Sequence, residues 1–200
     1  PAIVPKSGES KPVMFKKVAA KIQRGRVVGS IQGGLMCMPF QEYYWITSGQ
    51  VRFSIDELSE VLTDELTKNS YTVVGDPTAL FEDESEWKAE YLIGALITDL
   101  NANICFPWSG YGNFNKAKGE ASIKVEWQIW SRRIRSVVLQ LTTEGSGKVK
   151  NEMPLGDSEV FLQAFSMAVN NLLADRKFFE LVALDKDVPE REAEDKETLP

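Results

Sequence analysis

The stretch that decides the fold is Ala89 to Gly145. It opens with AEYLIGALI at 89–97, passes through the loop FPWSGYGNF at 106–114 and ends in two alternating runs. In residues 89–106 both alternating positions are apolar, which is typical of a central strand covered on both faces for part of its length. Residues 119–131 and 136–144 each alternate apolar and polar side chains around the polar turn at 132–135, which predicts an antiparallel hairpin. The stretch therefore predicts three neighbouring strands, with an aromatic, glycine-rich loop between the first two.

Helical patterns lie on either side of this sheet. Residues 54–68 repeat apolar side chains at helical spacing, and Ser54 with Glu57 forms a capping box. Residues 159–174 carry a wide apolar stripe, typical of a helix that lies across a sheet, with Asp157 or Ser158 as its expected cap. Residues 176–184 predict a short helix that completes the core.

The remaining segments extend the sheet. Residues 12–22 and 27–38 predict two strands that form a candidate hairpin, whereas 40–45 and 145–156 are expected to be loops, and 71–74 is expected to be a short strand. The sequence thus predicts one α+β domain over residues 12–184, with a mostly antiparallel sheet of about six strands and two main helices. A flexible lead-in is expected at 1–11, and a disordered acidic tail at 185–200.

Composition argues against most chemistry. The chain has no histidine, which excludes Ser-His-Asp and Cys-His catalysis and histidine-based metal sites. Two cysteines are too few for a zinc cage, the acidic segments lack a calcium-loop pattern, and Gly110 and Gly112 lack a nucleotide-loop pattern, so no cofactor or metal is expected. The net charge of −6 argues against nucleic acid, although residues 1–26 are basic.

Cys37 and Cys105 each lie near the end of a predicted strand. They could form one disulfide in an oxidising compartment, or remain two small buried thiols. Sequence cannot supply the Cα separation that a disulfide requires, so the buried thiols are slightly favoured.

Aromatic side chains are the candidate binding residues. Pro107, Gly110 and Gly112 are expected to shape a turn that displays aromatics for protein or glycan contacts, although packing on the domain's own core is an equal alternative. A second cluster either folds over the edge of the core, which is favoured, or forms an exposed patch. One further tryptophan faces away from the predicted core. The candidates are Trp108, Tyr111, Phe114, Tyr43, Tyr44, Trp45 and Trp130.

Asp99 and Glu120 are the two acids that bracket the aromatic loop in sequence. Paired carboxylates can hydrolyse glycosides, so these two are the remaining catalytic candidates. With no other recognisable catalytic constellation, the sequence predicts a protein that is not an enzyme.

Several of these segments resemble a known family. The strand at 89–97, the hairpin Val125 to Gly145, and Phe161 to Leu181 with Ala164 and Ala168 facing the sheet resemble a bacterial cell-envelope α/β domain. That domain occurs in the amino-terminal region of TolB, in CsgG and in LpoB, and similar elements occur in auxiliary lipoproteins of envelope ABC transporters. The resemblance covers residues 50–184 and leaves out the amino-terminal strands and the 106–114 loop.

The resemblance implies an accessory protein of the periplasm or outer membrane that binds other proteins and performs no chemistry. Such proteins are often lipid-anchored through a segment that would lie upstream of this sequence, which itself predicts no membrane-spanning stretch. The alternatives are a regulatory or targeting domain of a larger protein such as an envelope hydrolase, a glycan or small-ligand binder, and a cytoplasmic location. The sequence does not predict an oligomeric state.

Overall fold

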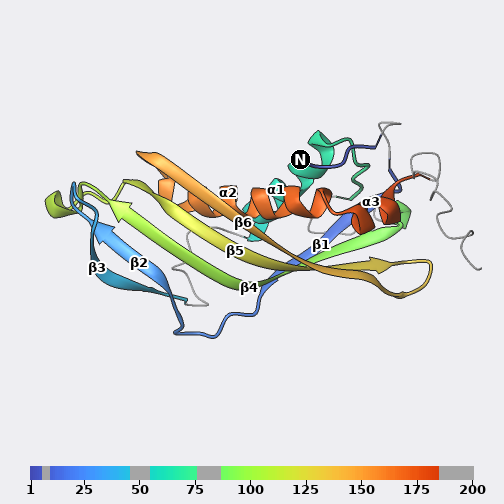
Figure 1. Cartoon of the computed structure of the whole chain (residues 1–200), viewed down its shortest axis with the longest axis horizontal. Helices are drawn as coiled ribbons and strands as arrows, with labels where there is room; N and C mark the ends of the chain where they lie inside the picture. Colours follow the sequence, from blue (N-terminus) through green and yellow to red (C-terminus); the bar gives the residue numbers. More distant parts are fainter. Residues whose placement is uncertain (6–9, 46–54, 76–86, 185–200) are drawn as a thin grey trace, which may run out of the picture.

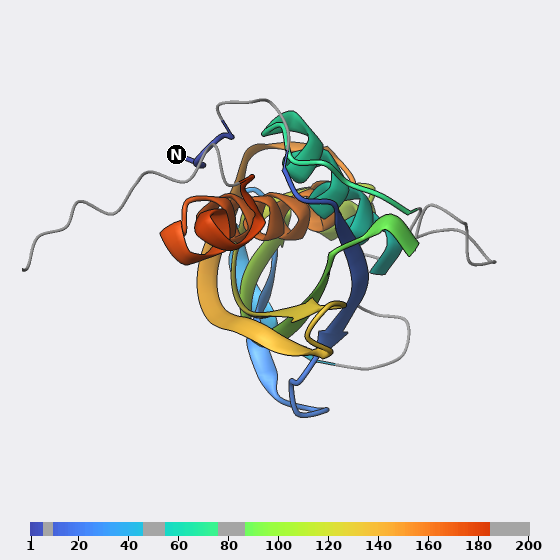
Figure 2. The ribbon, with the colours of Figure 1, turned by 90° about the vertical axis from the view of Figure 1, so that its right-hand side faces the viewer.

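The computed structural model describes residues 1–5, 10–45, 55–75 and 87–184. Within these ranges, six strands form one mixed sheet, and three α-helices lie against one face of it (Figures 1 and 2). The strands are β1 (Val13–Ala20), β2 (Val27–Gly33), β3 (Met38–Tyr44), β4 (Tyr91–Phe106), β5 (Lys116–Ser131) and β6 (Ser136–Pro154). The helices are α1 (Ile55–Lys68), α2 (Gly156–Leu173) and α3 (Arg176–Val182).

The sheet order is β3-β2-β4-β5-β6, with β1 paired to the other half of β4. Pairs β2–β3, β4–β5 and β5–β6 are antiparallel, and β1 and β2 each run parallel to β4. The predicted α+β class and mostly antiparallel sheet are therefore confirmed. The hairpin predicted from the alternating runs is β5–β6.

The predicted hairpin between residues 12–22 and 27–38 is wrong. Strand β4 has 16 residues, about 53 Å of extended chain, so one of its edges can hold two shorter strands end to end. β1 pairs with 91–97 and β2 with 102–106, so both satisfy their backbone groups on β4 rather than on each other. β2 forms its hairpin with β3, which means that residues 40–45 are largely strand and not loop.

The long strand β6 also replaces a predicted loop, at residues 145–156. Two glycines there, Gly145 and Gly147, face α2 so closely that an added Cβ would lie 2.0 Å from the Ala164 carbonyl oxygen and 2.1 Å from that of Val160. The glycines that suggested a loop instead permit a close helix–strand contact, as glycine in a strand often does.

Helix α2 also covers the outer edge of β6 (Figure 1). Asn171 Nδ2 donates to the carbonyl of Glu144 at 2.7 Å, and the backbone N–H of Lys148 donates to Gln163 Oε1 at 3.1 Å. Between them, the N–H of Ser146 points at Met167 Sδ at 3.3 Å. Four helical residues rise about 6 Å and two strand residues about 6.7 Å, so every fourth side chain of α2 meets every second residue of β6. Over residues 144–148, this edge is thereby closed to another strand.

The core lies between the sheet and α2. The ring of Trp127 on β5 packs on Phe165 of α2 with ring centroids 5.8 Å apart, and both side chains are fully buried. Trp127 Nε1 donates to Thr143 Oγ1 at 2.7 Å, and Thr143 Oγ1 donates to the Ala168 carbonyl at 2.8 Å. The indole therefore keeps its hydrogen bond inside an apolar layer.

Helix α2 begins earlier than predicted. It starts at Gly156 after Leu155, whose backbone is left-handed with φ 56°, and no side chain caps it. The expected cap by Asp157 or Ser158 is therefore wrong, because both residues already lie in the first turn. The predicted short helix at 176–184 is confirmed as α3, capped by Asp175, whose side chain accepts from the N–H groups of Lys177 and Phe178.

The first residues of the chain lie against its last described segments. The N–H of Ile3 donates to the carbonyl of Leu173 at 2.9 Å, and the N–H of Lys11 to that of Val182 at 2.8 Å. The predicted strand at 71–74 is reduced to one bridge, between Val73 and Val13. Ser54 of the predicted capping box, the acidic segment at 82–86 and the tail 185–200 lie outside the described residues.

Candidate functional site

Three turns that are distant in sequence meet at one end of the sheet. They are the β2–β3 turn at 34–37, the β4–β5 loop at 107–115 and the β6–α2 corner at 153–155, all at the left-hand end in Figure 1. They meet because β4 ends where β5 begins, and β2 and β6 lie on either side of that pair.

A disulfide joins the first turn to the central strand. Cys37 and Cys105 are bridged, with a Cα–Cα separation of 5.4 Å. The preference for two buried thiols is therefore wrong: pairing of Gly33 with Phe106 brings the β2–β3 turn over the end of β4, which sequence spacing could not reveal. The N–H of Gly34 also donates to Ser109 Oγ at 3.1 Å, so the turn is linked both to β4 and to the loop.

The 107–115 loop is organised by its own aromatic rings. Phe114 packs edge-on against the buried Phe106 with centroids 5.5 Å apart, and Trp108 lies against Tyr111 at 6.2 Å. A single 3-10 turn, η2 (Ser109–Tyr111), ends at Gly112 in the left-handed conformation that glycine favours. Of the residues expected to shape this turn, Gly112 has the left-handed backbone and Gly110 does not.

The third segment is fixed to the loop by a polar contact. Trp108 Nε1 donates to Glu152 Oε1 at 2.9 Å. A Cβ added to Gly156 would lie 2.0 Å from the Ala117 carbonyl oxygen, so the corner sits directly on the start of β5. Loop and corner therefore form one surface.

That surface, here called the apolar tip, exposes large apolar side chains from all three segments and from the adjoining start of β3. Met36 and Tyr111 are the most exposed, at 83% each, and even Trp108 is 39% exposed. Its members are Leu35, Met36, Met38, Phe40, Trp108, Tyr111, Phe114, Met153 and Leu155. Large apolar side chains exposed together at one end of a molecule mark a site of interaction more often than a solvated end.

Lysines lie directly behind the apolar tip. A hollow of about 250 Å³ beside the disulfide is lined by Lys118, Lys148 and Lys150, and Lys116 pairs with Pro154 at the tip itself. Lys148 forms an ion pair with Glu120 at 3.0 Å. Within the described ranges, no ion pair involves the other three lysines.

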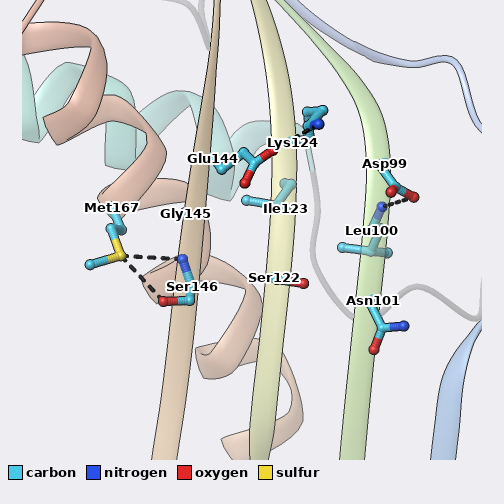
Figure 3. Close-up of a pocket in the computed structure, with 10 residues that line it drawn as sticks. All are labelled: Asp99, Leu100, Asn101, Ser122, Ile123, Lys124, Glu144, Gly145, Ser146 and Met167. Atoms are coloured by element: carbon cyan, nitrogen blue, oxygen red, sulfur yellow. Dashed lines mark hydrogen bonds and ion pairs between the residues drawn. The ribbon is translucent and has the colours of Figure 1, made fainter.

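The face of the sheet opposite the helices is polar and carries further hollows. The larger, of about 310 Å³, has Asn101, Ser122 and Ser146 side by side on β4, β5 and β6 (Figure 3). The small serine side chains leave it open. A neighbouring hollow of about 290 Å³ shares these three residues and continues toward Asn103 and Lys148.

Ion pairs flank this polar row. Lys124 Nζ lies 2.7 Å from Glu144 Oε1 (Figure 3), and hydrogen bonding to Glu144 raises the pKa of Lys124 above its ordinary value. Arg26 Nη2 lies 3.0 Å from Asp99 Oδ1. The charges on this face are thus largely compensated in pairs.

Asp99 and Glu120 do not form a catalytic pair of the predicted kind. Asp99 lies opposite Lys124 and Glu120 opposite Asn103, so the two acids are four positions apart along the strands, about 13 Å. Glycosidases hold their two carboxyl groups roughly 5–10 Å apart. Each acid is also engaged by a cation, Arg26 or Lys148.

The other predicted site residues are spread over the molecule. Trp45 is buried at 7% exposure in the core cluster, and Tyr43 packs on Phe161 of α2. Tyr44 is exposed and donates a hydrogen bond to Glu42, which raises the pKa of the tyrosine hydroxyl. Trp130 is half-buried on the polar face, paired with Leu92 at the end away from the apolar tip.

The structure adds residues that sequence patterns did not single out. Leu35, Met36 and Met38 flank Cys37, and Met153 and Leu155 form the β6–α2 corner. The sequence does contain an indication of these residues. The apolar run LMCM at 35–38 lies between two glycines and a proline, in a turn, where polar side chains are usual. An apolar run in a turn is a stronger indication of exposure than one in a strand.

Within the described part of the chain, no cluster of three or more His, Cys, Asp or Glu side chains could hold a metal ion. Among the helices of the same residues, none has the length and apolar composition needed to cross a bilayer.

No model of a known protein family matches the sequence, and no curated protein matches it. Solved structures do. A Xanthomonas campestris protein of family DUF330 matches with 11% identity and a TM-score of 0.45, over 83% of each chain. Hypothetical protein CT253 of Chlamydia trachomatis matches with 11% identity and a TM-score of 0.46, over 84% of this chain and 95% of its own.

PelC of Paraburkholderia phytofirmans, solved as a dodecamer, matches with 13% identity and a TM-score of 0.43, over 88% of this chain and 94% of its own. Bacterial lipoproteins occur among the further matches. The resemblance to the TolB, CsgG and LpoB domain stays a prediction. At these identities and TM-scores, the function has to be argued from the geometry of this chain.

Proposed function

We propose that this chain is a non-enzymatic accessory module of the bacterial cell envelope, and that it acts by binding other components of the envelope, proteins or lipids, through the apolar tip. The observation that carries the proposal is the convergence of nine exposed apolar side chains, seven from three separate segments and two from the start of β3. An isolated exposed apolar residue needs no explanation. Exposure of many apolar side chains to water is unfavourable in free energy, and a binding partner that covers them would remove this penalty.

The disulfide supports the envelope location. Disulfides form and persist in oxidising compartments such as the periplasm and are rare in the cytosol. The Cys37–Cys105 bridge stabilises the very turn that carries Leu35, Met36 and Met38. A periplasmic or outer-membrane-associated site of action is therefore proposed over a cytoplasmic one.

The absence of chemistry is proposed from the side chains. The sequence has no histidine, and the two acids considered for glycoside hydrolysis are too far apart and already paired. No other carboxylate pair suggested catalysis in the sequence.

The sheet edges formed by β3 and β6 are poorly suited to binding a further strand. Strand β3 is interrupted by two irregularities of register and contains Pro39. Proline and bulges are devices that prevent a further strand from pairing at an edge. Because α2 covers residues 144–148 of β6 as well, the apolar tip is proposed as the binding surface.

The test is a photoreactive residue placed at position 111 in cells of the native host, with Ile134 as the control position. Ile134 is also an exposed apolar residue of a turn, at 60% exposure, but lies in the β5–β6 turn at the far end of the sheet. We expect covalent adducts from position 111 and none from position 134. Equal adducts from both positions, or none from either, would remove the proposal. If the partner is a protein, as predicted from the sequence, the adducts will have the added mass of a protein.

A second candidate function, binding of a polar ligand or glycan, is favoured by one observation. The hollow around Asn101, Ser122 and Ser146 presents amide and hydroxyl groups in a row without a charged side chain between them. Titration with a panel of oligosaccharides would detect it, and Asn101→Ala should abolish the heat of binding. Binding that survives this substitution would exclude the hollow. The alternative of a regulatory domain detached from a larger hydrolase stays a prediction.

A further inference from the structure

We infer that the apolar tip docks on the surface of a lipid bilayer with anionic headgroups. The inference rests on the proposed function, because it assigns a class of partner to the same surface. Three features carry it: the shape of the tip, its side-chain composition, and the lysines behind it.

The tip is built from turns, so it projects outward. Each of its three segments connects two consecutive elements: β2 and β3 at 34–37, β4 and β5 at 107–115, and β6 and α2 at 153–155. One side chain on each segment, Met36, Tyr111 or Leu155, is at least 69% exposed. A protein partner would need a matching concave pocket for each projection. A bilayer interface is fluid and accepts separate projections, each to a depth of about 5–10 Å.

The composition suits the boundary between lipid and water. Trp108 and Tyr111 are amphipathic aromatics of the kind enriched at membrane interfaces, and leucine, methionine and phenylalanine supply the purely apolar contacts. Trp108 Nε1 already donates to Glu152, so the ring can enter an apolar layer without an unpaired donor.

The charges behind the tip match phosphate headgroups. The hollow lined by Lys118, Lys148 and Lys150 lies beside the disulfide, and Lys116 lies on the tip. In the described ranges, Lys116, Lys118 and Lys150 have no ion-pair partner. Of the nearby carboxylates, Glu120 is paired with Lys148 and Glu152 accepts from Trp108. The chain has a net charge of −6, yet lysines without an ion-pair partner lie behind its apolar tip. These lysines would attract the tip toward an anionic surface.

The same lysines argue against a second copy as the occupant. Two tips packed against each other would bring two sets of unpaired lysines together, and like charges in an interface oppose association. The links that hold the tip, the disulfide and the Gly34–Ser109 hydrogen bond, also mean that docking orders little new chain.

The experiment is flotation of the purified, oxidised chain with vesicles. One set contains phosphatidylglycerol and phosphatidylethanolamine, and the other contains only phosphatidylcholine. We expect the chain to float with the anionic set and much less with the neutral one. The triple variant Met36→Ser, Tyr111→Ser, Leu155→Ser should lower binding to the anionic set at least about tenfold.

Two matched controls separate docking from general effects. The triple variant Trp87→Ser, Ile134→Ser, Val137→Ser removes three exposed apolar side chains from the opposite end and should bind like the unaltered chain. Lys116→Gln with Lys150→Gln should weaken binding about fivefold per lysine on anionic vesicles only, whereas Lys16→Gln with Lys17→Gln on β1 should have little effect. Thermal unfolding of each variant checks that the fold is retained.

Three results would overturn the inference. One is failure of the unaltered chain to float with anionic vesicles, and another is loss of vesicle binding to the same extent in the two triple variants. A tip-dependent increase in molecular size with protein concentration, in the absence of lipid, would assign the surface to a second copy. Protein adducts from position 111 in cells, without lipid adducts, would reject the bilayer and leave the proposed function standing. No adduct there at all would remove both.

Discussion

At the scale of single residues, the buried hydroxyl of Thr143 is the most informative. It accepts from Trp127 Nε1 and donates to the Ala168 carbonyl, so it links β5, β6 and α2. Thr143→Val should lower the free energy of unfolding by about 1–3 kcal/mol, because the buried indole N–H loses its acceptor. Thr142→Val, an exposed neighbour on the same strand, should change it by less than about 0.5 kcal/mol. Urea unfolding would measure both, and equal effects would show that the hydrogen bond contributes nothing.

Tyr71 predicts a dependence of stability on alkaline pH. Burial raises the pKa of its hydroxyl above the ordinary 10.0, and the hydroxyl donates to the Ile3 carbonyl at 2.7 Å. Above about pH 10 the unfolded chain releases this proton and the folded chain retains it, so this stabilisation is complete below pH 10 and decreases as pH rises, by up to about 1.4 kcal/mol per unit.

The measurement is urea unfolding from pH 8 to pH 11.5, approximately the range around the ordinary tyrosine pKa of about 10. Tyr71→Phe should cost about 1 kcal/mol at neutral pH and should lack this part of the alkaline decrease. Lysines titrate in both proteins, so the difference between the two curves isolates the tyrosine. Parallel curves would contradict the prediction.

At the scale of elements, the contact of α2 with β6 depends on glycine. Gly145→Ala would place a Cβ 2.0 Å from the Ala164 carbonyl oxygen, so helix and strand must separate. We expect a loss of at least about 2 kcal/mol in the free energy of unfolding, since overpacking against backbone cannot relax by a rotamer change. Gly110→Ala, with no atom within 4 Å of the added Cβ, is the matched control. Similar stabilities for the two variants would show that the helix can shift freely.

Sequence patterns predicted the elements whose periodicity is local. The alternation of β5 and the stripe of α2 are each set by one neighbouring layer, so their periods survive in the sequence. Pairing partners were not predictable in the same way. Whether residues 12–22 pair with 27–38 or with β4 depends on the length and twist of a strand more than 60 positions away, and no local signal reports it.

The candidate site shows the same division. Trp108, Tyr111 and Phe114 could be singled out because the glycines and proline around them predict a loop. Leu35, Met36 and Leu155 could not be joined to them, because the connection is made by tertiary pairing of β2 and β6 with the sheet. Trp45 was a candidate because it lies in an aromatic cluster of the sequence. It follows β3 directly, and its position in the core is set by tertiary packing.

At the scale of the whole molecule, the disulfide is the main covalent constraint on the sheet. It closes a loop between residues 68 positions apart, for which loss of chain entropy in the unfolded state corresponds to about 4 kcal/mol. The double variant Cys37→Ser, Cys105→Ser should lose a stability of this order and should not respond to reductant, whereas the unaltered chain should. Thermal unfolding with and without reductant checks both, and an unaltered chain indifferent to reductant would contradict the prediction.

The contacts of Ile3 and Lys11 with Leu173 and Val182 have a consequence for how the protein is made. In a chain synthesised from its amino terminus, β1 can pair as soon as β4 has been made, but Ile3 and Lys11 lack their acceptors until Leu173 and Val182 have appeared. Contacts of such long sequence separation are formed late and slowly. The docking of residues 3 and 11 on the last two helices is therefore among the latest steps of folding.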